Sequence, residues 1–274
     1  MSPLLHHRTR HALAHCPAVP HRGTRRGEPG LHALQRLQHR PPSPLATLTL
    51  HHTLHPSMSS PAVDYDALEA TTTIEEITED ECDQETLRSL KNDELPSLWL
   101  RETGLADQHG DYELRSSTEL GWLGHFMKKS TRLESFGILG GDVFHNCSEQ
   151  SIDRFLFDLR KCNHIKKMHF VRTYLAEIIY KLGGAMKSNS ITHLVVEGCH
   201  LRVPEATFLF NNLPDVMEEL WISCEHDGED VLDDDIMAEC IPSLANCTGM
   251  RKLKFNGLNL STNSCAALGA VFPR

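Results

Sequence analysis

The feature that most constrains this chain is a short apolar pattern that occurs six times. In each copy, apolar residues stand at positions 0, +3 and +5, as Ile191, Leu194 and Val196 do in the stretch SITHLVVEGCHL. Successive copies begin 38, 32, 26, 26 and 33 residues apart. A period of roughly 20–50 residues is typical of arrays whose units pack on their neighbours. The copies are Leu95/Leu98/Leu100, Leu133/Phe136/Ile138, Ile165/Met168/Phe170, Ile191/Leu194/Val196, Met217/Leu220/Ile222 and Met250/Leu253/Phe255.

A second apolar pattern, at the spacing of an amphipathic helix, lies between successive triplets. It predicts that each unit is a short strand followed by a helix, so that stacked units form one parallel sheet with helices on one side. Ser148 suits an N-cap, Pro204 suits a first helical turn, and Asp233–Asp235 place negative charge at a helix N-terminus. The apolar helix positions are Leu120/Leu123/Phe126/Met127, Ile152/Phe155/Leu156/Leu159, Leu175/Ile178/Ile179/Leu182, Ala206/Leu209/Phe210/Leu213 and Ile236/Cys240/Ile241/Leu244.

The stretch Ile191–Leu201 matches the pattern LxxLxLxx(N/C)xL in full and resembles a leucine-rich repeat. The helix-containing units are similar to those of the ribonuclease-inhibitor-like subclass. The resemblance covers residues 95–274 and implies an α/β solenoid of about six repeats, a horseshoe arc with a parallel concave sheet and outer helices. Such a domain is expected to bind other proteins.

Two departures from the family pattern carry expectations of their own. In the family, the side chain at the Asn/Cys position helps to satisfy backbone groups of the turn. The residue at this position varies in this chain, so we expect irregular turns and an uneven arc. The last triplet is followed by CAALGAVFPR, in which a helix begins and no polar cap follows. We therefore expect a C-terminally incomplete array, or an end that a partner or a second copy covers. The residues at the Asn/Cys position are Thr103, Gly141, Thr173, Cys199, Glu225 and Leu258.

The first 57 residues form a basic segment, with seven Arg, no Lys, ten His and eight Pro against one acid, Glu28. They hold few aromatic or β-branched residues and no sustained periodicity, so we expect disorder. The composition is open to four interpretations: an organelle transit peptide, an RNA-binding or nuclear-import tail, a His-rich metal-binding tract, or sequence upstream of a native start at Met58.

Residues 58–94 switch the balance of charge, with twelve Asp or Glu against Arg88 and Lys91. We expect an acidic linker here, solvated from Val63 to Asp83. A short helix is predicted over Gln84–Lys91, with Asp83 as its N-cap and with Leu87 and Leu90 on the face that shields the first repeat.

Motifs of catalysis, metal binding and membrane insertion are missing from the sequence. No apolar run approaches the ~18 residues of a membrane-spanning helix. The nine Cys include no CxxC pair, which favours reduced, buried thiols in a cytoplasmic or nuclear protein. The stretch KLGGAMKS departs from the phosphate-binding loop at Met186, and the acidic loop Cys224–Asp235 lacks the EF-hand spacing. We therefore expect a protein that is not an enzyme and that uses no cofactor and no metal.

Candidate binding residues are those that point away from the apolar core of each strand. One position per repeat forms a column across the sheet, and its tryptophans are the candidate anchors, because Trp is enriched at the energetic centres of protein interfaces. Glu218 and Glu219 flank Trp221, and an aromatic beside acids suits a basic peptide or surface. The predicted partner-binding residues are Trp99, His169, Val195, Trp221, Lys254, Glu218 and Glu219.

Three functions follow from this sequence. The first is a non-enzymatic scaffold that binds a protein on the concave sheet. The second is a substrate-recognition subunit of a larger complex such as a ubiquitin ligase, although no adaptor-binding motif precedes Leu95. The third is nucleic-acid binding through the basic tail, the Lys166/Lys167 pair and the Arg251/Lys252 pair, which the net negative charge of the repeats opposes.

Overall fold

A computed structural model describes residues 63–103, 110–188, 190–199, 201–223, 234–258 and 260–272. All of them belong to one compact unit, Ser59–Arg274. The basic segment 1–57 lies outside the described residues, as do most of the acidic loop after Ser223 and the Asn/Cys position at Glu225. None of the described helices is long and apolar enough to cross a membrane.

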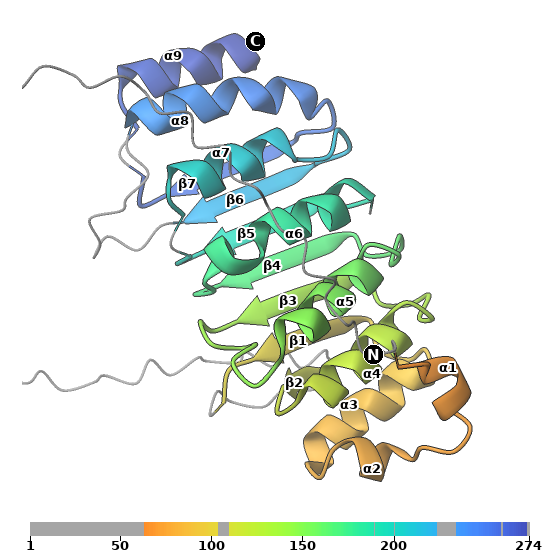
Figure 1. The fold of residues 1–274 in the computed structure, drawn as a ribbon. Coiled ribbons are helices and arrows are strands. Elements are labelled where there is room, and N and C mark those ends of the chain that lie inside the picture. The colour runs from red at the N-terminus through yellow and green to blue at the C-terminus, as the bar shows by residue number, and fades with distance from the viewer. Residues whose placement is uncertain are drawn as a thin grey trace, which may run out of the picture. The chain divides into compact units, whose positions relative to one another are not determined.

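The strands that the structure describes form one parallel sheet of seven, in the order β2-β1-β3-β4-β5-β6-β7 (Figure 1). The second and third residues of all six predicted triplets lie in strands. Neighbouring strands pair without slippage, so that Leu98 faces Phe136 and Phe136 faces Met168. An α/β architecture with a parallel sheet is thereby confirmed. The strands are β1 (Ser97–Arg101), β2 (Asp111–Glu113), β3 (Ser135–Leu139), β4 (Lys167–Val171), β5 (His193–Glu197), β6 (Glu219–Ser223) and β7 (Lys252–Asn256).

Strand β2 is the element that the apolar pattern did not predict. It is three residues long, pairs with β1 at the edge of the sheet, and carries no triplet. Its Tyr112 is fully buried all the same. Three residues are too few for a periodic signal, so the strand is defined by its pairing.

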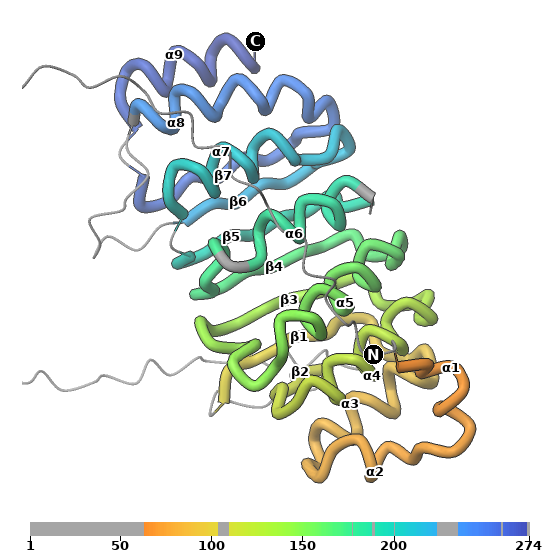
Figure 2. The backbone as a smooth tube through the Cα atoms, in the orientation of Figure 1, coloured from red at the N-terminus to blue at the C-terminus, as the bar shows by residue number. Residues whose placement is uncertain are grey.

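Helices α4 to α9 cover one side of the sheet, and each contacts the next (Figure 1). The tube in Figure 2 traces the repeated path from strand through turn to helix. Ser148 is the N-cap of α5, where its Oγ accepts from the Ser151 N–H, and Pro204 stands in the first turn of α7. The helices are α4 (Ser117–Met127), α5 (Glu149–Leu159), α6 (Leu175–Ser188), α7 (Val203–Asn211), α8 (Asp234–Cys240), the 3-10 helix η1 (Ile241–Asn246) and α9 (Thr262–Val271).

The core lies between the sheet and these helices. The triplet residues of β1 and β3 to β6, such as Phe170 and Leu194, are completely buried. Burial of one such side chain stabilises the fold by about 1.5–3 kcal/mol. In β7, the strand at the other edge of the sheet, Leu253 and Phe255 are only partly buried. The predicted small-hydrophobe role of the cysteines holds for Cys162, Cys199, Cys240 and Cys247, which are all buried.

The turns that follow β4 and β5 are more regular than the sequence suggests. The Cys199 Sγ donates to the Phe170 carbonyl at 3.4 Å, and the Thr173 hydroxyl lies 3.2 Å from the Ile138 carbonyl. Both acceptors are third residues of a triplet in the preceding strand. Threonine thus does in one repeat what cysteine does in the next, because both side chains carry a donor one atom beyond Cβ.

The stretch 63–94 corrects the expectation of a solvated linker. It contains three helices, α1 (Tyr65–Leu68), α2 (Ile74–Ile77) and α3 (Glu81–Lys91), which pack on α4 and β2. Ile74 and Ile77 are buried, as are Leu87 and Leu90, so α3 shields the first repeat as predicted. These apolar residues, sparse among acids, gain burial only once α4 and β2 are in place.

The N-cap of α3 is also corrected. Helix α3 begins at Glu81, and Asp80 caps it by accepting from the Cys82 and Asp83 N–H groups at 2.9 and 3.2 Å. Asp83 is buried and accepts from the Glu113 N–H of β2 at 3.0 Å. Its carboxylate therefore joins the helix to the edge strand.

Candidate functional site

The candidate site is the face of the sheet turned away from helices α4 to α9. The predicted column lies in register across six strands, and we call it the central column. Its side chains alternate along each strand with the buried triplet residues. The members of the central column are Trp99, Gly137, His169, Val195, Trp221 and Lys254.

At one end of the central column, Trp99 lies over Gly137 and meets His169. The Trp99 and His169 ring centroids are 5.2 Å apart, at an interplanar angle of 43°. Burial is the main cause that lowers the pKa of His169, and the Lys167 and His193 charges add to it. His169 is therefore a neutral hydrogen-bonding group at neutral pH, and its ring packs against the Trp99 indole. The sequence placed Gly137 in the same column as both rings, but it gave no sign that the missing side chain of Gly137 lets them meet.

At the other end, Trp221 is half-buried between Val195 of β5 and Lys254 of β7. The Lys254 ammonium stands 4.4 Å from the centroid of the indole ring, in a cation–π contact. The indole N–H is buried and has no acceptor among the residues that the structure describes. Trp221 thus lies on the open face as predicted, and its strand neighbours cover part of the ring.

The two acids beside Trp221 differ in what they can offer. Glu219 forms an ion pair with Lys252 of β7 at 2.6 Å, and the Lys252 hydrogen bond holds the pKa of the Glu219 carboxyl below its usual value. Glu218 precedes β6, and its backbone carbonyl accepts from the Arg251 and Lys252 N–H groups. Of the two carboxylates that were expected to attract a basic partner, the one of Glu219 is therefore already neutralised by Lys252.

The carboxyl ends of β3 and β4 open onto a separate cavity of 340 Å³. His145, Cys147, Glu149 and Tyr174 are among its lining residues. Burial raises the pKa of the Cys147 thiol to about 11, so at neutral pH this sulfur stays protonated and is a poor nucleophile.

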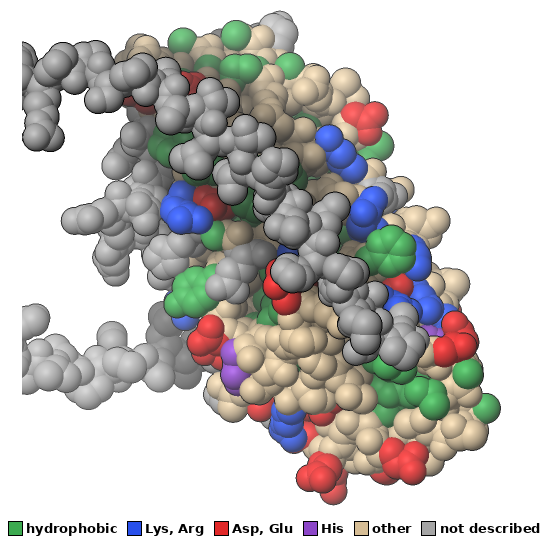
Figure 3. Space-filling model, in the orientation of Figure 1, with side chains coloured by type: hydrophobic (Ala, Val, Ile, Leu, Met, Phe, Trp, Pro, Cys, Tyr) green, Lys and Arg blue, Asp and Glu red, His purple; other side chains and the backbone are tan. Residues whose placement is uncertain are grey.

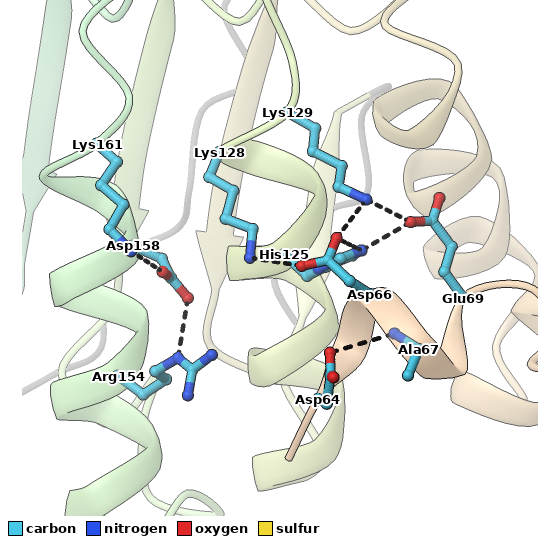
Figure 4. A network of polar contacts seen from close by, with 10 residues as sticks. All are labelled: Asp64, Asp66, Ala67, Glu69, His125, Lys128, Lys129, Arg154, Asp158 and Lys161. Carbon is cyan, nitrogen blue, oxygen red and sulfur yellow. Dashed lines mark hydrogen bonds and ion pairs between the residues drawn. The ribbon is translucent and has the colours of Figure 1, made fainter. Parts of the chain in front are cut away.

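Another polar cluster joins α1 to α4 (Figure 4). The fully buried His125 lies with its Nε2 2.9 Å from the Glu69 carboxylate, and Asp66 stands beside them. The spacing of these three residues resembles a metal site, but the Lys129 ammonium lies 2.6 Å from Glu69 and 2.8 Å from Asp66. A cation of the chain itself therefore occupies the place a metal would take, and the cluster fastens α1 to α4.

The helix-covered side has a different character. Across its described part, hydrophobic, basic and acidic side chains are interspersed (Figure 3). Its exposed aromatic side chains include Phe157 of α5 and Tyr180 of α6, which are 51% and 50% exposed. The Lys161 ammonium covers Phe157 at 4.2 Å. Among the described residues, the two tryptophans in one register column distinguish the strand face from this side.

Comparison with known proteins adds no family to these observations. No protein-family model matches the chain, and no curated protein matches it significantly.

Proposed function

We propose that residues 95–274 form a leucine-rich-repeat arc of the ribonuclease-inhibitor-like subclass. The support for this proposal comes from contacts between neighbouring repeats. Six strands carry the same triplet in register, and Thr173 and Cys199 bond to equivalent carbonyls of the preceding strands. A side-chain donor at this position that reaches back to the previous unit is what the repeat pattern requires of its Asn or Cys.

We propose further that the chain is a non-enzymatic scaffold whose open strand face binds a protein. The observation that carries this proposal is the pair of half-buried tryptophans, Trp99 and Trp221, in one column of that face. A parallel sheet is commonly covered on both faces, so an apolar surface on the second face favours a covering partner. The free, buried thiols suit the reducing cytoplasm or nucleus as the place where it works.

The nucleic-acid alternative has less support. Of its proposed basic pairs, Lys166 is bonded to Glu134 at 3.2 Å and Lys252 to Glu219 at 2.6 Å. Within the described part of the chain, each pair therefore keeps one cation without an ion pair, Lys167 in the first and Arg251 in the second. The substrate-recognition alternative uses the same strand face as the scaffold and differs from it only in what else the chain recruits.

The test starts from partners captured by the full chain and measures the affinity of each for Trp221→Ala and for wild type. Loss of an aromatic anchor costs about 2–4 kcal/mol, or roughly 30- to 1,000-fold in Kd. The matched control is Phe157→Ala, which removes an exposed aromatic from the helix side. Equal affinities for wild type, Trp221→Ala and Trp99→Ala would sink the proposal, provided the variants melt like the wild type.

A further inference from the structure

The charge on the open strand face points to the chemistry of its partner. In the row beside the central column, Lys167 of β4 pairs in register with His193 of β5, and His193 with Glu219 of β6. Glu219 forms an ion pair with Lys252, and Arg101 of β1 forms one with Asp111 of the edge strand β2 at 2.7 Å. The exposed Lys167 side chain makes no ion pair with any residue that the structure describes. An unneutralised positive charge is thus left near the middle of the face.

Two imidazoles adjoin that charge. His169 lies two residues along the same strand and on the same side of the sheet, and His193 is the cross-strand neighbour of Lys167. The His193 Nδ1 is bonded to the Thr192 hydroxyl at 2.8 Å, which leaves its Nε2 free of that bond. One ammonium and two imidazoles together offer an acidic group a positive charge and several N–H donors.

Apolar surface lies on both sides of this basic group. Trp99 adjoins it two strands away on β1, and Trp221 lies two strands away on β6. With strands about 4.8 Å apart, the two tryptophans lie roughly 19 Å from one another across the sheet. An extended peptide covers that length with about six residues.

A carboxylate that makes no ion pair with the described residues also lies on this face, at Glu197. It is exposed at the carboxyl end of β5, in register with Val171 and Ser223. It therefore lies along the opposite edge of the strand face from Lys167 and His193, and does not neutralise them. Its position gives a bound segment a preferred direction.

We infer that the partner presents an acidic, extended segment to this face. In that segment, an Asp or Glu docks on Lys167, His169 and His193, and apolar side chains on either side of it pack on Trp99 and Trp221. The inference rests on the proposed binding function of the open strand face. It replaces the basic partner expected from Glu218 and Glu219 because Lys252 already holds Glu219.

The probe is a random peptide library displayed on phage and selected against the full chain. We expect the enriched peptides to carry an acid between apolar residues, and Lys167→Glu to weaken the best of them at least about tenfold. Lys187→Glu, the same reversal of charge at an exposed position of α6, is the matched control and should leave its affinity unchanged.

The outcomes distinguish a failure of the acidic-segment inference from a failure of the proposed binding function. Enriched peptides that are basic or uncharged, or that bind Lys167→Glu as well as wild type, overturn the acidic segment and leave the binding face standing. Peptides that bind the Trp99→Ala/Trp221→Ala double variant as well as wild type, or a selection that enriches nothing, overturn the binding face itself. Thermal melting confirms that every variant is folded.

Discussion

Trp99 lies directly over Gly137, and a Cβ atom at position 137 would stand 2.4 Å from the Trp99 Cε3 atom. The missing side chain on β3 is what lets the indole of β1 reach His169 of β4. One glycine therefore sets the conformation of an aromatic pair that spans three strands.

Substituting Gly137→Ala should lift Trp99 away from His169. Since burial is the main cause that lowers the pKa of His169, we expect this pKa to rise toward its usual value in the variant. Titration of the imidazole by NMR measures the change. Gly269→Ala is the control, because a Cβ there meets nothing within 4 Å. An unchanged titration would show that Trp99 does not shield His169.

The Thr173 hydroxyl is a buried polar group whose removal is testable. It lies 3.2 Å from both the Ile138 and the Val171 carbonyls. Thr173→Val keeps the shape and removes the donor, so we expect the free energy of unfolding in urea to fall by about 1–2 kcal/mol. Thr173→Ser keeps the donor and loses one methyl group, at a cost of about 1 kcal/mol. A smaller loss for valine than for serine would mean that packing matters more than the hydrogen bond.

Asp83 should make the protein less stable as the pH rises. Burial raises the pKa of this carboxyl to about 7, and the Glu113 N–H bond only partly opposes it. The folded state therefore holds the Asp83 proton more tightly than the unfolded chain, whose Asp pKa is about 3.9. Stability from this group is fully present below about pH 4 and is lost as the pH rises through about 7.

Asp83→Asn removes that dependence, since an amide cannot ionise and its oxygen can still accept from the Glu113 N–H. At about pH 8, we expect a free energy of unfolding about 4 kcal/mol above that of wild type, because ionising Asp83 in the folded state costs about three pKa units at about 1.4 kcal/mol each. The control is Asp80→Asn, because the Arg115 hydrogen bond lowers the pKa of Asp80 and reverses the sign, so that wild type loses this stability as the pH falls. Parallel stability-versus-pH curves for wild type and Asp83→Asn would contradict the prediction.

Gly121 decides how α1 lies on α4. A Cβ at position 121 would stand 1.8 Å from the Tyr65 hydroxyl oxygen, whereas one at Gly124 of the same helix meets its nearest atom at 3.4 Å. Gly121→Ala should expel the Tyr65 ring from its contact with Trp122, whose centroid is 4.9 Å away. We expect faster hydrogen exchange in residues 65–68 with a nearly unchanged melting temperature. Gly124→Ala is the control, and equal exchange in both variants would mean that Tyr65 does not hold α1 in place.

The periodic part of this protein could be derived from its sequence. In a strand or helix, the side chain that faces the core recurs at a fixed spacing, so Leu194 and Val196 could be assigned to a strand and Leu209 and Phe210 to a helix without knowledge of their neighbours. The column of Trp99, His169 and Trp221 followed from the same alternation. Each of these assignments depends on residues within one repeat.

The tertiary structure decided whatever depends on residues from different parts of the chain. Strand β2 exists because β1 pairs with it, and the helices of residues 65–91 are packed because α4 and β2 receive their few apolar side chains. Glu219 and Lys252 are one whole repeat apart in the chain but only one strand spacing apart in space, and this closeness in space lets Lys252 neutralise Glu219. Local spacing carries no information on such contacts, because they form only when the units stack. The sequence by itself therefore determined where the face lies, and the stacked structure decided which of its charges are free.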